Sequence, residues 1–242
     1  MNHVIMLAGG VGMRMNTNGV PKQFLSLYGK PIIIYTLEKF SLSPWVDDMV
    51  VVCHRNWMDY MKLLVEKYSI SKNVKIVEGG KDRQDSVNNG IAGLGKDIAL
   101  DDVVLIHDSV RPLVSLDTIE KNIEQAKIYG CVMTVKPAIE TVVVANGENA
   151  EFTHFQQRDI SYSLTSPQSF RMDVLQEIMC KSSQTESDMP ILDMAMMYAF
   201  MGNKVYMVKE KDGSNIKITT PVDYYYFKAI VELEENKKIL GL

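Results

Sequence analysis

Residues 4–23 read VIMLAGGVGMRMNTNGVPKQ, and this stretch decides the fold. Residues 4–7 form an apolar run, which predicts a short buried strand. Glycines follow at once, and their missing side chains let the backbone turn sharply and present N–H groups to a ligand. These glycines are Gly9, Gly10 and Gly12. The stretch therefore predicts a strand that ends in a ligand-binding turn.

Two cationic side chains follow the glycines. They are Arg14 and Lys22, and Pro21 restricts the backbone just before the second. Backbone donors together with cations beyond the end of a strand suit the binding of several phosphate groups. A glycine turn that carries two solvated cations is the alternative that this stretch alone leaves open, because such turns are common in α/β proteins.

The composition is that of an ordinary globular protein, with 46% hydrophobic and 23% charged residues in a chain of 242. A net charge of −4 gives no electrostatic basis for binding nucleic acid or a membrane surface. No apolar run approaches the ~18 residues of a membrane span. The three cysteines are widely spaced and include no C-x-x-C pair, so we expect reduced thiols, no cysteine-based metal site and a cytoplasmic location.

Apolar strands alternate with helical patterns over the first part of the chain. After the first strand, further strands are expected at residues 50–53, 74–77, 103–106 and 131–135, and helices at 32–40, 57–68, 86–94 and 116–129. This alternation predicts an α/β fold with a mostly parallel sheet and helices on both faces. Ligands on such sheets bind beyond the carboxyl ends of the strands, so the residues after Ile106 should join the glycine turn there.

The alternation breaks at residues 137–160. Residues 140–145 and 151–157 read as extended runs on either side of Asn146-Gly147, which predicts a β-hairpin. A lone two-stranded hairpin is marginally stable in water, so this β-arm should pack on another surface. A second copy of the chain is one candidate for that surface, which makes a homodimer our expectation.

The rest of the chain completes one domain. Helices are expected at residues 173–180, 192–201 and 222–240, and strands at 205–208 and 216–219. No repeat, low-complexity tract or linker interrupts the sequence. We therefore expect a single domain over residues 1–242 that carries the arm within it.

Residues 79–86, GGKDRQDS, follow one expected strand and open a helix. Their small side chains permit the close approach of a flat base. Asp85 or Ser86 can cap the helix, meet a ribose or base, or do both. This cluster is therefore a candidate for binding a nucleoside.

Residues 107–112, HDSVRP, come directly after the fourth expected strand. The carboxylate of Asp108 is a hard oxygen ligand, which suits a Mg²⁺ ion that bridges phosphates. His107 alone is typical of a hydrogen-bonded structural histidine, and we assign it no chemistry.

Two further cations stand out in the second half of the chain. Arg158, at the base of the arm, can hold a phosphate with two nitrogens, although a surface arginine on a strand explains it equally well. Lys217 lies inside an apolar run that predicts a strand, and a lysine buried there needs an anionic partner.

These clusters are individually unspecific, but in this order they resemble one family. The motifs are LAGG-x-G-x-R, PKQ, GG…R-x-DSV, HDSVRP and NIKITTP, which span residues 4 to about 223. They resemble the cytidylyltransferases that make CDP-activated polyols, namely the 2-C-methyl-D-erythritol 4-phosphate and D-ribitol 5-phosphate enzymes. The resemblance implies a Rossmann-like nucleotidyltransferase sandwich, CTP as co-substrate and Mg²⁺ as cofactor. It also implies a homodimer in which each arm reaches the partner's site.

The resemblance implies roles for individual residues as well. Nucleotide binding falls to Leu7, Ala8, Gly9, Gly10, Gly12, Gly80, Lys81, Asp82, Arg83, Gln84, Asp85, Ser86 and Ser109, and metal binding to Asp108. The implied catalytic residues are Arg14, Lys22, Arg158 and Lys217. The polyol phosphate would meet Arg111, Thr141, Arg158, Ser166 and Lys217, with Thr141 and Arg158 supplied by the partner's arm.

The implied reaction agrees with these residue types. An oxygen of the polyol phosphate attacks the α-phosphorus of CTP in line, and pyrophosphate leaves. A phosphate monoester is already anionic near neutral pH, so the reaction requires no dedicated general base. The site must align the reactants and neutralise charge, which are tasks for cations and backbone donors.

Two departures from the family pattern concern the polyol. Glu140-Thr141 stands where the family usually has Asp-Thr, and Leu192-Asp193 where it usually has Thr-Asp. HDSVRP and PQSF are closer to the ribitol enzymes, so D-ribitol 5-phosphate, with a role in teichoic acid synthesis, is the preferred expectation. 2-C-methyl-D-erythritol 4-phosphate, with a role in isoprenoid synthesis, is the alternative.

Other classes of protein are disfavoured. A nicotinamide-dependent dehydrogenase needs G-x-G-x-x-G and an acidic residue after the second strand, where this chain has Cys53-His54-Arg55. The G-x-x-x-x-G-K-[ST] motif of P-loop kinases and GTPases is missing. A non-catalytic nucleotide-binding protein stays an alternative, because a fold does not fix a function.

Overall fold

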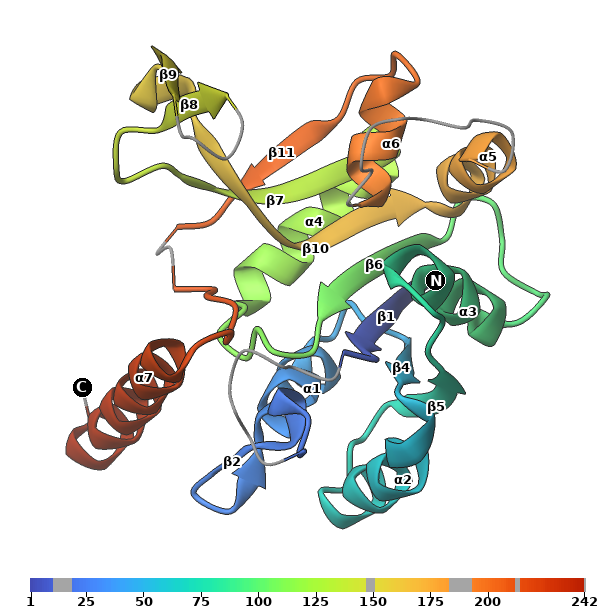
Figure 1. Cartoon of the computed structure of the whole chain (residues 1–242). Coiled ribbons are helices and arrows are strands. Elements are labelled where there is room, and N and C mark those ends of the chain that lie inside the picture. The colour runs from blue at the N-terminus through green and yellow to red at the C-terminus, as the bar shows by residue number, and fades with distance from the viewer. Residues whose placement is uncertain (11–18, 147–150, 183–192, 212–213, 242) are drawn as a thin grey trace.

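The computed structural model of the chain describes residues 1–10, 19–146, 151–182, 193–211 and 214–241. Within these residues a seven-stranded sheet forms the centre of the molecule, in the order β11-β7-β10-β6-β1-β4-β5 (Figure 1). Its strands are β1 (Asn2–Ala8), β4 (Asp48–Cys53), β5 (Asn73–Glu78), β6 (Val103–Asp108), β7 (Cys131–Pro137), β10 (Tyr162–Arg171) and β11 (Tyr206–Lys209). Neighbouring strands are parallel except where β10 is involved, which confirms the predicted mostly parallel sheet.

Helices cover both faces of this sheet, as predicted. They are α1 (Ile32–Leu42), α2 (Met58–Lys67), α3 (Arg83–Leu94), α4 (Leu116–Tyr129), α5 (Met172–Ser182), α6 (Met194–Phe200) and α7 (Pro221–Leu240), with short 3-10 turns η2 (Lys22–Phe24), η3 (Arg55–Trp57) and η4 (Arg158–Ile160). α1, α2 and α4 pack on one face, and α3, α5 and α6 on the other. In β1, Val4 and Met6 join the first core and Ile5 the second. A strand covered on both sides therefore reads as a continuous apolar run.

β10 is a strand that the sequence patterns do not predict. It lies antiparallel between β6 and β7, and it carries Pro167 and several polar residues, a composition typical of a loop. These polar side chains are buried and hydrogen-bonded within the protein, which makes the strand possible. They are Thr165, Ser166, Gln168 and Ser169.

Residues 216–219 are extended but form no strand, so that prediction was wrong. The segment lies against the loop after β6, where Ile218 N donates to Val110 O at 2.9 Å. Ile216 and Ile218 join an apolar cluster with residues of α7, whereas Lys217 between them lines a pocket. The alternating pattern therefore reflects burial of one side of an extended segment, and not sheet pairing.

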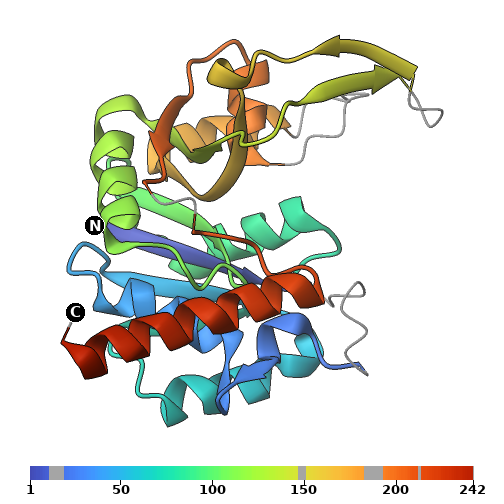
Figure 2. The ribbon, with the colours of Figure 1, turned by 90° about the vertical axis from the view of Figure 1, so that its left-hand side faces the viewer.

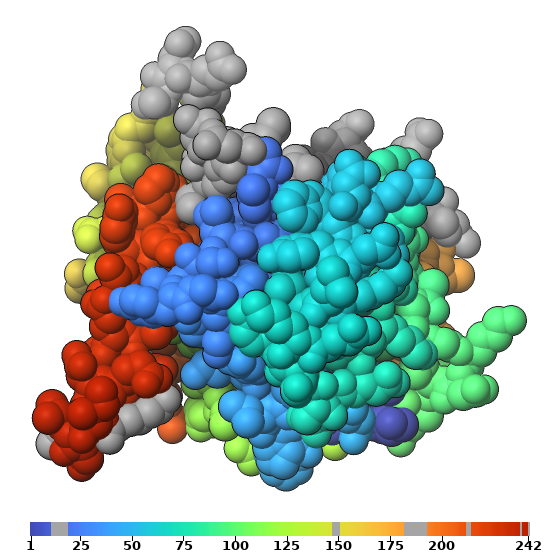
Figure 3. Space-filling view, turned by 90° about the horizontal axis from the view of Figure 1, so that it is seen from below, coloured from blue at the N-terminus to red at the C-terminus, as the bar shows by residue number. Residues whose placement is uncertain are grey.

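α7 runs along the outside of the molecule (Figure 2). Its Phe227 packs against Leu27 and Ile32, and it meets the ring of Tyr35 edge-on at 5.1 Å. Seen from below, α7 adjoins the surface formed by the first part of the chain (Figure 3), where β2 (Ser26–Leu27) and β3 (Lys30–Pro31) make a short hairpin. No helix within the described residues combines the length and apolar character that crossing a membrane requires.

The predicted hairpin projects from the body of the molecule (Figures 1 and 2). β8 (Val143–Asn146) and β9 (Glu151–Phe155) pair antiparallel, while the predicted turn at Gly147 lies outside the described residues. Several apolar side chains on and beside this arm are exposed, and two of their rings, Phe152 and Phe155, lie 4.7 Å apart. The exposed side chains include Ile139, Val143, Phe152, Phe155 and Ile160. Such a surface is typical of one that another molecule covers.

At the opposite end of β1 from the glycine turn, buried His3 lies between two carboxylates. Its Nδ1 is 2.7 Å from Asp48 Oδ1 and its Nε2 is 3.3 Å from Asp102 Oδ2. Burial alone would lower the pKa of His3, but the hydrogen bonds and charges of Asp48 and Asp102 outweigh it and raise the pKa above its ordinary value of 6.5. When the ring is protonated, it ties β1 to two neighbouring segments through both of its nitrogens.

We expect the stability that His3 contributes to be complete below about pH 6.5 and to be lost as the pH rises through the higher pKa of the folded state. The reason is that the folded protein binds this proton more tightly than the unfolded chain. Urea unfolding of the wild type and His3→Gln between about pH 6 and pH 9 should show a stability difference that shrinks with rising pH. A difference that stays constant would contradict a charged His3.

Candidate active site

A pocket of about 710 Å³ opens at the carboxyl ends of β1 and β6, where the sequence predicted a ligand site. It brings together residues that are far apart in the chain. They are Leu7, Ala8, Gly9, Gly10, Lys22, Gln23, His54, Gly80, Lys81, Asp82, Arg83, Ser86, Asp108, Ser109, Val110, Lys217 and Thr219. Most of the predicted nucleotide-binding residues thus line one cavity.

Gln23 fixes the start of the glycine turn after β1 by hydrogen bonds, although the sequence patterns assigned this residue no role. Its buried side chain donates from Nε2 to Ala8 O at 2.7 Å and to Gly10 O at 2.9 Å. Gln23 lies in η2, next to Lys22, so the same short turn fixes the glycine backbone and places a cation at the pocket wall. The PKQ motif was the available sequence signal for this residue.

Gly80 allows α3 to begin close to the end of β5. A Cβ atom on Gly80 would lie 2.2 Å from Asp85 Cβ and 2.8 Å from Ser86 N, which no side chain can tolerate. Its N–H donates to Ser86 Oγ at 3.0 Å. Asp82 caps the helix by accepting from Asp85 N at 2.8 Å, so the predicted cap at Asp85 or Ser86 was wrong. The helix begins earlier than its apolar pattern indicates, because its first turn is polar.

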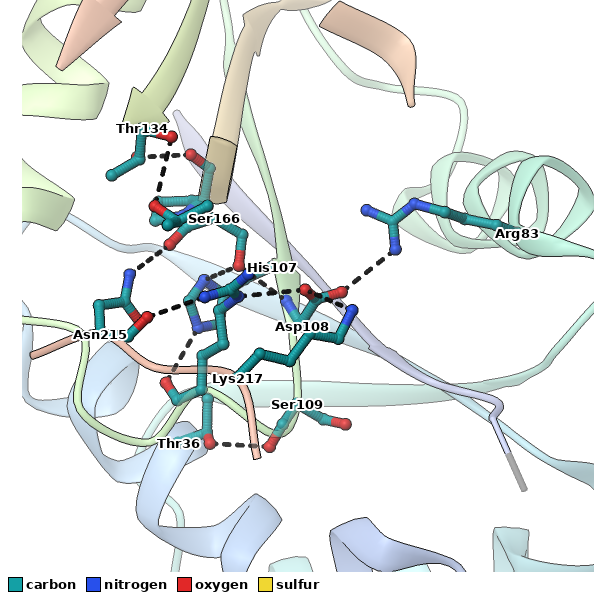
Figure 4. Close-up of polar contacts among 12 residues, drawn as sticks. Thr36, Arg83, His107, Asp108, Ser109, Thr134, Ser166, Asn215 and Lys217 are labelled. Atoms are coloured by element: carbon teal, nitrogen blue, oxygen red, sulfur yellow. Dashed lines mark hydrogen bonds and ion pairs between the residues drawn. The ribbon is translucent and has the colours of Figure 1, made fainter. Parts of the chain in front are cut away.

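Asp108 is the last residue of β6 and sits between three cations (Figure 4). Arg83 Nη1 lies 3.1 Å from Oδ1, while Arg111 Nε and Lys217 Nζ lie 3.2 Å and 3.0 Å from Oδ2. Burial alone would raise the pKa of Asp108, but Lys217, Arg83 and Arg111 hold it well below its usual range. The carboxylate is therefore ionised, and both of its oxygens contact cations of the chain.

His107 precedes Asp108 in β6 and is fully buried. Its Nε2 lies 3.2 Å from Arg111 O and its Nδ1 lies 3.0 Å from Ser166 Oγ. Burial lowers the pKa of His107 to about 3, so the ring is neutral near physiological pH. Both ring nitrogens are hydrogen-bonded away from the pocket. The structure therefore agrees with the expectation that His107 transfers no proton in the reaction.

Other predicted residues lie beside the pocket and not on its wall. Gln84 faces away, with its Nε2 3.2 Å from Met194 Sδ, and Asp85 packs against Gly80. Arg111 and Ser166 lie beneath Asp108, where they contact its carboxylate and its backbone N–H. These residues therefore shape the site without lining it.

The predicted arm residues are separate from the pocket of their own chain. Thr141 and Arg158 are exposed on the projecting arm and do not line the cavity. Gly12 and Arg14, together with Leu192 at the substrate-side departure, lie outside the described residues. Besides Gln23, the pocket residues to which the sequence patterns assigned no binding role are His54, directly after β4, Val110 and Thr219. The rule that places ligands beyond the carboxyl ends of parallel strands applies to β4 as well and could have found His54.

We expect Gly80→Ala to impair both folding and nucleotide binding, because the new methyl group must push the first turn of α3 away from β5. Overpacking of this kind costs about 1–3 kcal/mol of stability, and displacement of the Asp82–Ser86 turn should weaken CTP binding by about tenfold. Thermal unfolding and calorimetric titration with CTP measure the two effects.

Gly79→Ala is the matched control for this prediction, since a Cβ there would meet its nearest atoms at an ordinary 3.5 Å. It should unfold at nearly the wild-type temperature. Equal losses of stability and of CTP affinity in the two variants would show that crowding at Gly80 does not constrain this turn.

Known proteins resemble this chain in sequence and in fold. The model of the family described as IspD, 2-C-methyl-D-erythritol 4-phosphate cytidylyltransferase, matches residues 2–233. A ribitol-5-phosphate cytidylyltransferase of Vibrio parahaemolyticus serotype O3:K6 is 39% identical, with 100% of both chains covered. A 2-C-methyl-D-erythritol 4-phosphate cytidylyltransferase of Clostridium botulinum (strain ATCC 19397 / Type A) is 36% identical over 96% of this chain and 97% of its own.

A solved structure agrees with these matches. The crystal structure of 4-diphosphocytidyl-2C-methyl-D-erythritol synthase from Anaerococcus prevotii DSM 20548 has a TM-score of 0.82 at 25% identity, and 96% of each chain is covered. The family model, the full-length relatives and the shared fold lead to one conclusion. This chain belongs to the 2-C-methyl-D-erythritol 4-phosphate cytidylyltransferase family of CTP-dependent nucleotidyltransferases.

Proposed function

We propose that the protein transfers CMP from CTP to a polyol phosphate, with D-ribitol 5-phosphate as the favoured acceptor, and releases CDP-ribitol and pyrophosphate. The observation that carries this proposal is the pocket at the ends of β1 and β6. There, open glycine backbone, three lysines and an ionised carboxylate converge, which is a set of groups that suits a triphosphate with a divalent cation.

Each part of the pocket suits one part of the nucleotide. Gly9 and Gly10 present backbone without side chains, and a Cβ on Gly10 would meet nothing within 4 Å, so a phosphate can approach closely there. Gly80 and Ser86 bound the side on which a flat base and its ribose fit.

The chain supplies charge neutralisation for an in-line displacement. Lys22 and Lys217 both line the pocket, and Lys217 reaches Asp108 from a different element. The attacking phosphate oxygen is already anionic, so no residue has to remove a proton. Preorganised cations at the α-phosphorus and the leaving pyrophosphate lower the barrier because charge develops at those positions in the transition state.

A divalent cation such as Mg²⁺ fits this pocket as a companion of the nucleotide. Asp108 offers an ionised carboxylate on the wall, and in nucleotide sites this ion is typically held by one or two carboxylates together with phosphates and water. In the part of the chain that the structure describes, no cluster of three or more His, Cys, Asp or Glu side chains could hold a metal alone. When bound, the cation would neutralise phosphate charge.

The choice of D-ribitol 5-phosphate rests on likeness to named relatives. Those called ribitol-5-phosphate cytidylyltransferase are 39–40% identical over the whole chain, against 36–37% over 96% of it for the methylerythritol enzymes. The HDSVRP motif points the same way. We accordingly propose a cytoplasmic role in supplying CDP-ribitol for ribitol-phosphate polymers such as teichoic acids.

We also propose a homodimer in which the arm completes the partner's site. Thr141 and Arg158 are exposed on the arm and do not line the pocket of their own chain, although the resemblance assigns them to the polyol phosphate. The arm also exposes apolar side chains, among them Phe152 and Phe155, that a partner would cover. An isologous dimer would satisfy both features at once.

The decisive experiment measures pyrophosphate release from CTP and Mg²⁺, with D-ribitol 5-phosphate and 2-C-methyl-D-erythritol 4-phosphate in parallel. We expect a kcat/KM preference for ribitol of at least about tenfold, and a loss of about 10²–10³-fold in kcat in Lys22→Ala, because a cation at the reacting phosphates is removed. Lys62→Ala, at an exposed lysine of α2, is the matched control.

The outcomes of this assay separate the alternatives. A preference for the methylerythritol substrate would assign the isoprenoid reaction. CTP binding without turnover of any polyol phosphate would support a non-catalytic nucleotide-binding protein on this fold. An unchanged kcat in Lys22→Ala would remove Lys22 from the catalytic residues.

Subunit mixing tests the proposed role of the arm. Arg158→Ala and Lys217→Ala homodimers should each be inactive, whereas mixed dimers carry one site with both residues intact. Random reassociation of equal amounts should restore about a quarter of the wild-type activity, because half of the dimers are mixed and each has one working site. Activity that stays at the level of the homodimers after proven exchange would place Arg158 in its own chain's reaction.

A further inference from the structure

β10 leaves its neighbour β6 just before the active-site end of the sheet. The two strands pair as far as Gln168↔Ile106, and β10 then shifts its register against β7. Beyond the last pair, the backbone N–H of Asp108 donates to a side chain, Ser166 Oγ, at 3.2 Å. A serine hydroxyl therefore replaces a ladder bond at the residue that carries the carboxylate of the site.

The direction of the neighbouring hydrogen bonds follows from their chemistry (Figure 4). Arg111 O can only accept, so His107 Nε2, 3.2 Å away, carries the ring proton. The neutral ring then has a lone pair at Nδ1, which accepts the Ser166 hydroxyl proton across 3.0 Å. The bonds thus run one way, from Asp108 N–H to Ser166, from Ser166 to His107, and from His107 to Arg111.

This direction leaves Ser166 without a proton to give to a substrate. Its hydroxyl proton is committed to His107, its oxygen accepts from Asp108, and the side chain is buried away from the pocket wall. The resemblance assigns Ser166 to the polyol phosphate, but its bonds in the structure point inward. Ser166 therefore acts on the site through the residues that it holds.

We propose that Ser166 and His107 are positioning residues, which fix the end of β6 so that the Asp108 carboxylate keeps its place in the pocket. The inference rests on the proposed function, since Asp108 is the carboxylate offered to CTP and its cation. Without the Ser166 acceptor, the backbone of Asp108 loses the bond that replaces the sheet ladder on this side. The carboxylate could then follow the pull of its three cations.

The same residues hold the segment that carries Lys217. Ser166 O accepts from Asn215 Nδ2 at 2.7 Å, and Asn215 O accepts from Arg111 Nη1 at 2.8 Å. Lys217, two residues beyond Asn215, meets Asp108 Oδ2 at 3.0 Å. Ser166 therefore sets the relative position of an anion and a cation that come from different elements, and a small shift there would misalign the reacting phosphates.

The test pairs a substitution in this chain of bonds with a matched one in the same strand. Ser166→Ala removes the acceptor of Asp108 N–H, whereas Ser169→Ala removes an equally buried hydroxyl of β10 that donates to Asn122 Oδ1 at 3.1 Å. In Ser166→Ala we expect the amide hydrogen exchange of Asp108 to accelerate by at least about tenfold. We also expect kcat to fall by about tenfold, with the KM values for CTP and the polyol phosphate within about threefold. Ser169→Ala should leave exchange at Asp108 and kcat unchanged.

Further variants separate positioning from loss of folding. Ser166→Thr keeps the hydroxyl and should retain the slow exchange at Asp108 and kcat to within about threefold. His107→Leu should lower kcat as Ser166→Ala does. Adding Ser166→Ala to His107→Leu should lower kcat only slightly further, because both substitutions break the same chain of hydrogen bonds. Thermal unfolding of every variant identifies any loss that comes from instability.

Two results would overturn the proposal. Unchanged exchange at Asp108 in Ser166→Ala would show that Ser166 does not hold this backbone, whatever the activity. A raised KM for the polyol phosphate at unchanged kcat, with additive effects of the two substitutions, would make Ser166 a direct substrate contact. Failure of the proposed function would appear separately, as absence of pyrophosphate release by the wild type, while the exchange measurement would still decide whether Ser166 holds Asp108.

Discussion

The Asp108 carboxylate, buried at the end of β6 among three cations, is the interaction on which the site depends. Burial by itself would raise the pKa of this carboxyl group, so the ionised form persists there because Lys217, Arg83 and Arg111 outweigh burial. Three positive charges around one negative charge leave a local excess of positive charge in a chain whose net charge is −4. Arg83 and Lys217 carry part of this charge on the wall of the pocket that opens at the glycine turn. The site is thereby prepared for a polyanion, and a triphosphate is the polyanion that the family binds.

These charges come from elements that meet only in the folded chain. Arg83 opens α3 on one face of the sheet, Arg111 follows β6, and Lys217 lies on the extended segment that leads to α7. β10 connects the elements of two of them, because the Ser166 hydroxyl accepts from Asp108 N–H at the end of β6 and the Ser166 backbone carbonyl accepts from Asn215 Nδ2. A polar strand in the centre of a sheet destabilises the fold unless its buried polar groups are hydrogen-bonded. The hydrogen bonds that this strand makes therefore stabilise it in that position.

The sequence determines some parts of this arrangement and not others, for physical reasons. The parallel strands and their helices follow from apolar runs such as residues 4–7 and 103–106, because burial on both faces leaves a local pattern. β10 leaves no such pattern, since the partners of Ser166 and Ser169 come from distant residues. The pocket could be predicted from strand ends and glycines. By contrast, the cap at Asp82 and the inward bonds of Ser166 depend on atomic contacts that residue types do not specify.

The three cations around Asp108 differ in how firmly they are held, which bears on the proposed reaction. The Arg111 side chain is 11% exposed and also donates to Asn215 O at 2.8 Å, so it is fixed on two sides. The Arg83 side chain is 41% exposed and meets Asp108 through one nitrogen at 3.1 Å. A divalent cation that reaches Asp108 with CTP would therefore take the place of Arg83 more easily than that of Arg111. Arg83 also lines the pocket, so its guanidinium would stay within reach of phosphate charge there, whereas Arg111 stays bound beneath the carboxylate.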